Sequence, residues 1–64
     1  MLTKREKEVF DLLIDNYSTA EIAEKMHISD KTVRNHISNV MLKLGVKGRA
    51  QAVVELIKLD ELKL

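Results

Sequence analysis

The sequence lacks cysteine, proline and tryptophan, and its 64 residues include only two glycines, one tyrosine and one phenylalanine. Without cysteine the chain can form neither a disulfide nor a thiolate zinc site, and its other residues show no clustered metal ligands. The absence of cysteine also fits a reducing, intracellular setting. Apolar runs are only a few residues long, far short of a membrane span. We therefore expect one small cytoplasmic domain, residues 1–64, that binds no metal, cofactor or membrane.

The lack of proline leaves little to interrupt helices, and lysine, glutamate, leucine and alanine are abundant. Apolar residues recur at helical spacing in four segments, which predicts helices over 4–15, 19–26, 30–44 and 49–59. A hydroxyl residue that can cap the first turn precedes three of these helices, at Thr3, Ser18 and Ser29. The predicted fold class is therefore all-α, with four helices.

The connection between the second and third predicted helices is very short, which is typical of a helix-turn-helix. Such a crossing needs a small residue where the two helices come closest, and Ala23 is placed there. It also needs a turn residue four positions later that tolerates an unusual backbone. His27 stands there, and histidine is among the residue types enriched at positive φ. Val33 supplies the buried aliphatic side chain in the first turn of the second helix of the motif.

Positive charge is concentrated in one part of the chain, although the formal net charge is only +1. Residues 29–49 contain five basic side chains and a single carboxylate, Asp30. The polar face of the helix over 30–44 carries Lys31, Arg34, Asn35 and Ser38. In a helix-turn-helix this helix enters the DNA major groove. Arginine can pair with guanine there, asparagine with adenine and serine with several partners. A merely solvated polar face remains the alternative.

Five short motifs follow one another along almost the whole chain: "LTKRE" at 2–6, "EIA" at 21–23, "KTVRNHISN" at 31–39, "KLGV" at 43–46 and "RAQAV" at 49–53. Together they resemble the LuxR/GerE-type DNA-binding domain, and in detail its stand-alone sporulation regulators. The resemblance implies a sequence-specific transcription regulator that binds double-stranded DNA at two half-sites as a homodimer. It further implies a nucleoid-associated role in late sporulation gene expression, as activator and repressor.

The resemblance also implies roles for single residues. Those that read base edges would be Arg34, Asn35 and Ser38. Those that lie near or on the phosphate backbone would be Lys31, Thr32, His36, Asn39 and Lys43. Lys47 carries a charge that suits either phosphate or solvent. Glu6 would pair with Arg49, which could instead bind phosphate. His27 and His36 have no carboxylate placed to orient either ring, so neither is expected to bind a metal.

Leucines near the C-terminal end are more numerous than one face of the last helix needs. They could pack within the chain or form a two-fold interface, which uses the same patch on both subunits. These leucines are Leu56, Leu59, Leu62 and Leu64. The resemblance implies that the last helix makes the homodimer, and a chain this short, burying only roughly 60% of its unfolded surface, favours such support.

Two other function classes remain. A protein-interaction module would dock on the transcription machinery, for instance RNA polymerase, through apolar anchors on the polar face of the helix over 30–44, where only Leu42 fits. An enzyme is not expected, because the sequence has no nucleophile–base pair, no paired carboxylates on one face and no phosphate loop. The chain is also too small to offer much of a pocket, so no small-molecule ligand is expected.

Overall fold

The computed structural model describes residues 2–63, and these form four α-helices with no strand among them. The helices are α1 (Lys4–Ile14), α2 (Thr19–Met26), α3 (Asp30–Leu44) and α4 (Arg49–Lys58). Each boundary lies within one residue of its predicted position. The all-α class is therefore confirmed. Among the described residues, no helix is long and apolar enough to cross a membrane.

The first turns of α1 and α2 are closed by reciprocal capping boxes. The Thr3 hydroxyl accepts the Glu6 N–H at 3.1 Å, and the Glu6 carboxylate accepts the Thr3 N–H at 3.0 Å. Ser18 and Glu21 make the same two bonds, with distances of 3.1 and 2.8 Å. Ser29 caps α3 through its hydroxyl. These bonds satisfy N–H groups that a helix start otherwise leaves without a partner.

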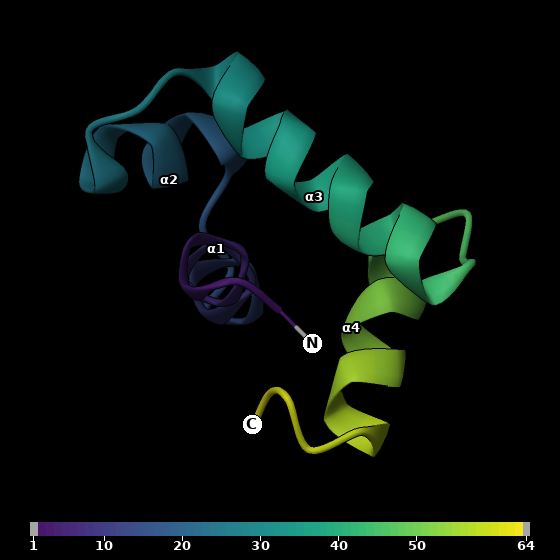
Figure 1. Ribbon diagram of the computed structural model, residues 1–64. Coiled ribbons are helices and arrows are strands. Elements are labelled where there is room, and N and C mark those ends of the chain that lie inside the picture. Colours follow the sequence, from purple (N-terminus) through teal and green to yellow (C-terminus); the bar gives the residue numbers. More distant parts are fainter. Residues whose placement is uncertain (1, 64) are drawn as a thin grey trace.

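Helix α3 is the centre of the molecule. Figure 1 shows it running across the fold, with α2 at its beginning, α4 at its end and α1 below, and α3 packs against all three. Its buried stripe consists of Val33, Ile37 and Val40. The remaining side chains of the core come from the other helices and the C-terminal tail: Val9, Phe10, Ile22, Ala23, Met26, Ala52, Leu56 and Leu62. Because the core fixes one side of α3, the opposite side faces solvent.

The turn between α2 and α3 has the geometry predicted for a helix-turn-helix. His27 adopts the left-handed conformation, with φ 57° and ψ 44°. The N–H of Ile28 then reaches back to the carbonyl oxygen of Ala23 at 3.0 Å, which ends α2. Ala23 and Val33 are both buried. The left-handed residue therefore reverses the backbone between α2 and α3, and the buried side chains of Ala23 and Val33 lie on either side of the turn.

The C-terminal tail corrects one of the sequence expectations. After α4 the chain turns back toward α1 (Figure 1), and the Leu2 N–H lies 3.4 Å from the Glu61 carboxylate. Leu56 and Leu62 are both buried in the protomer's own core. They therefore pack within the chain and present no side chain for a two-fold interface. Leu59 is half exposed, and Leu64 lies outside the described residues.

Candidate nucleic-acid interface

The solvent side of α3 carries the three residues proposed from the sequence to read bases. Arg34, Asn35 and Ser38 are all exposed. They lie within the first nine residues of α3, opposite the buried stripe. Their spacing of one and three residues brings them onto one helix face. This face offers a guanidinium, an amide and a hydroxyl, which together can donate to and accept from base edges.

A carboxylate stands beside the guanidinium on this face. Arg34 Nη2 lies 3.5 Å from Asp30 Oδ2, and the two side chains are 62% and 44% exposed. Asp30 was noted from the sequence as the single carboxylate in residues 29–49, but its pairing with Arg34 was not predicted. Their spacing of four within a helix was the available signal, since such side chains are neighbours on a helix surface.

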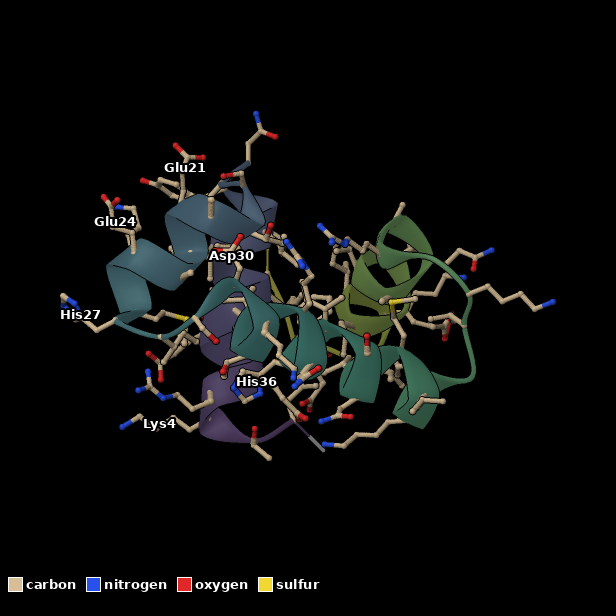
Figure 2. The ribbon with its side chains drawn as sticks, turned by 90° about the horizontal axis from the view of Figure 1, so that it is seen from above. Lys4, Glu21, Glu24, His27, Asp30 and His36 are labelled. Carbon is tan, nitrogen blue, oxygen red and sulfur yellow. The ribbon has the colours of Figure 1, made fainter. Side chains whose placement is uncertain are left out.

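The residues expected to contact phosphate surround this face and differ in how exposed they are. Lys31 and Asn39 are exposed, whereas Thr32 and His36 are half-buried. The Thr32 hydroxyl lies 2.9 Å from the hydroxyl of the α3 cap residue. Figure 2 shows His36 and Asp30 projecting from different sides of α3.

Lys43 and Arg49 differ from expectation. Lys43 Nζ lies 2.6 Å from Glu6 Oε1, so the partner of Glu6 is Lys43 and the expected pair of Glu6 with Arg49 is wrong. The reason is geometric: Glu6 is buried where α1 packs on α3, and Lys43 is in the last turn of α3. Arg49 is exposed at the start of α4. Lys43 can therefore reach a phosphate only by leaving or sharing the Glu6 carboxylate.

Lys47 lies in the loop between α3 and α4, where its N–H donates to Gln51 Oε1 at 3.1 Å. This loop and the outer face of α4 line an open groove of about 570 Å³ that includes Ala50, Val54 and Glu55. Val54 is 51% exposed. The exposure of Val54 was not predicted from the sequence, because which face of α4 is buried depends on how α4 packs against the other helices.

Polar side chains also lie around α2, away from α3. Within residues 2–63 no three histidine or acidic side chains are grouped to hold a metal ion. His27 is at the outer end of α2, and Glu21 and Glu24 point away from α3 on the far side of α2 (Figure 2). In its capping box the Glu21 carboxylate accepts the Ser18 N–H, and the Glu21 N–H donates to the Ser18 hydroxyl. The bond from the backbone N–H of Ser18 lowers the pKa of Glu21. These residues cap helices or face solvent.

The four helices, the left-handed turn before α3 and the exposed polar face of α3 define a helix-turn-helix protein of the nucleic-acid-binding type. The sequence pattern of the family described as bacterial regulatory proteins, luxR family, matches residues 1–56. The chain belongs to this family, and it is a DNA-binding transcription regulator.

Similar proteins agree with this assignment. The chain is 66% identical over 64 residues to the spore germination protein GerE of Bacillus subtilis (strain 168), covering all of this chain and 86% of that protein. It is 53% identical over 58 residues to the transcriptional regulatory protein DegU of Brevibacillus brevis, covering 91% of this chain and 25% of DegU. A solved structure of the transcription factor GerE matches with a TM-score of 0.94 and 58% identity, over 97% of this chain and 92% of that one.

Proposed function

We propose that the chain acts as a homodimer whose two α3 helices read two DNA half-sites. Arg34, Asn35 and Ser38 contact the base edges in this proposal. The observation that carries it is their joint exposure within the first nine residues of α3, opposite the buried stripe. In a helix-turn-helix this part of the second helix meets the bases, and the arginine is suited to guanine.

The residues around this face hold the protein on the phosphate backbone in this proposal. Lys31 and Asn39 are exposed beside the reading residues, and Thr32 and His36 are half-buried at the edge of the face. Lys47 adds a charge from the loop before α4, and Lys43 adds one from the end of α3 when it leaves the Glu6 carboxylate. Phosphate contacts orient the protein without selecting sequence. Binding should therefore weaken steeply as salt concentration rises.

The dimer contact is assigned to the outer face of α4. Val54 is 51% exposed and lies in the groove next to Ala50. Leu59, at the end of α4, is also 51% exposed but does not line this groove. A second copy related by a two-fold axis would cover this apolar surface with the same surface of its own. This replaces Leu56 and Leu62, whose side chains are buried inside the protomer.

The cellular role is proposed from the named relatives. The Bacillus subtilis relative is a spore germination protein, which supports a role in late sporulation gene expression, as activator and repressor. The protein would then act on the nucleoid, by binding DNA rather than by catalysis, and without a small-molecule ligand.

The test is a selection of this chain on random duplex DNA at near-physiological salt, sequenced after several rounds. We expect enrichment of one motif as two related half-sites. Arg34→Ala should cost about 1–3 kcal/mol at one base pair and relax preference there. Lys31→Ala is the matched comparison and should weaken binding to all sequences about equally. Flat enrichment for the unchanged chain, or an unaltered motif for Arg34→Ala, would contradict the proposal.

One observation favours a second candidate function. Leu42 is 79% exposed on the solvent side of α3, and an apolar anchor there suits docking on a protein of the transcription machinery, such as RNA polymerase. A flat selection experiment would favour this alternative.

A further inference from the structure

Asp30 is a carboxylate on the surface that this protein turns toward a polyanion. It is the single acidic residue in residues 29–49, beside five basic ones. The start of α3 does not depend on it for a cap, because the Ser29 hydroxyl accepts the N–H of Thr32 at 3.1 Å. The interaction of an exposed acidic residue in the first turn with the helix dipole stabilises the helix only modestly.

Asp30 and Arg34 are both largely open to solvent, with side chains 44% and 62% exposed and 3.5 Å between Oδ2 and Nη2. Exposed ion pairs of this kind add little to the stability of a fold. What the pair does control is where the guanidinium points, because the carboxylate offers Arg34 a partner on its own helix. The pair therefore restricts the position of a residue assigned to base reading.

A guanidinium has five N–H donors, and pairing with guanine O6 and N7 uses two of them. The donors that remain can keep a carboxylate at the same time, so Arg34 need not give up Asp30 when it reads guanine. On any other sequence Arg34 finds no matching pair of acceptors. Reaching a phosphate instead would require it to leave Asp30, whose negative charge would then face the DNA backbone alone.

We propose that Asp30 is a specificity-determining residue, which holds Arg34 in position for guanine and penalises binding to duplexes that lack that base. The proposal rests on the assignment of Arg34 to base reading. Its physical basis is that repulsion between Asp30 and the DNA backbone weakens binding to a wrong duplex more than binding to the right one. Specificity can therefore rise without any gain in affinity for the right duplex. Asp30 has these effects by fixing the position of Arg34 and by placing a negative charge near the DNA phosphates.

The experiment compares binding of the selected operator and of a shuffled duplex, at one fixed salt concentration, for the unchanged chain and for Asp30→Asn. Asparagine keeps the size of the side chain and removes the charge. We expect affinity for the shuffled duplex to rise about threefold to tenfold and affinity for the operator to change less. Repeating the selection with Asp30→Asn should show a weaker preference for the guanine read by Arg34.

Two further variants separate this role from charge and folding effects. Asp11→Asn removes the same charge from another exposed pair with the same spacing, since Asp11 Oδ2 lies 3.1 Å from Lys7 Nζ on α1. It should leave the ratio of operator to shuffled affinity unchanged. Asp30→Glu keeps the charge and should keep the guanine preference. Thermal unfolding of each variant checks that the fold is intact.

The outcomes are distinguishable. If the unchanged chain selects a motif but Asp30→Asn keeps the same ratio and the same guanine preference, the Asp30 proposal is wrong and the proposed function stands. An equal change in ratio for Asp11→Asn would also overturn it, because bulk charge would then be the cause. If the unchanged chain selects no motif, both proposals fail.

Discussion

Glu6 shows how one side chain can join two helices. It is only 4% exposed, and its Oε1 accepts both the Thr3 N–H at 3.0 Å and the Lys43 ammonium at 2.6 Å. Burial raises the pKa of Glu6, but the hydrogen bonds from Lys43 and Thr3 outweigh burial and hold the pKa below its ordinary value of 4.5. The ionised carboxylate therefore stabilises the fold above pH 4.5, and this stabilisation is lost as the pH falls through the lowered pKa.

Glu6→Gln tests this contribution, because glutamine keeps an acceptor for the Thr3 N–H and removes the charge. We expect the free energy of unfolding at pH 7 to fall by about 1.5–3 kcal/mol, the range for a hydrogen bond to a charged group. The loss should shrink at pH 3, because below pH 4.5 protonation of Glu6 in the unfolded chain removes part of the stabilisation. Urea unfolding at both pH values measures it. Glu21→Gln is the control, because Glu21 makes the same capping box at an exposed position, and its loss of unfolding free energy should be smaller. If Glu6→Gln loses the same unfolding free energy at both pH values, the charge is not the cause.

The contacts of Glu6 also separate what residue patterns predict from what they do not. Its capping box with Thr3 was predicted, because both residues lie within one turn of the same helix. Its ion pair was assigned to Arg49 and is made by Lys43, which is 37 residues away in the sequence. The choice between two basic residues depends on how α1 crosses α3, and helical spacing carries no information about that crossing. The pair of Asp30 and Arg34 was within reach of the sequence, since it lies along one helix.

At the level of elements, all four helices are followed by a residue in the left-handed conformation. Its φ is 70° at Asn16, 57° at His27, 69° at Gly45 and 61° at Asp60. The left-handed conformation of His27 was expected from its residue type and position, whereas that of Asp60 was not. Start and stop signals act within a few residues, so the helix boundaries could be predicted closely from the sequence. The packing between helices needed the structure.

His27→Gly tests the cost of placing a side chain in the helix-turn-helix turn. The left-handed conformation raises the free energy of a folded non-glycine residue. Glycine adopts it with little strain but loses more conformational entropy on folding. We expect a net gain of about 0.5–1 kcal/mol in the free energy of unfolding, measured by urea unfolding. Gly45→Ala makes the opposite change, because it places a side chain at a left-handed position that glycine now occupies. A Cβ at Gly45 would meet nothing within 4 Å, so its expected loss of about 1 kcal/mol is purely conformational. A destabilised His27→Gly variant would show that the histidine makes a contact worth more than the strain.

At the scale of the whole molecule, the return of the C-terminal tail decides which apolar residues are free. Leu56 and Leu62 complete a core that α1, α2 and α3 leave open at one side, and both are buried. Sequence reasoning left open whether the leucines pack within the chain or between chains, because periodicity stops where α4 ends and the direction of the tail is set by long-range packing. The apolar surface that stays exposed is a smaller one on α4, around Val54.

Val54→Asp tests whether this surface joins two copies. Val54 is 51% exposed in the protomer, so an aspartate there should leave the protomer folded and monomeric, as measured by thermal unfolding at low concentration and by sedimentation equilibrium. Binding to DNA with two half-sites should weaken by roughly 100-fold, because the second α3 is no longer held near its half-site. Binding to a single half-site should stay the same and is the internal control. A Val54→Asp chain that still sediments as a dimer would place the two-fold contact elsewhere on the molecule. Equal weakening on single and double half-sites would instead mean that the substitution disturbs α3 itself.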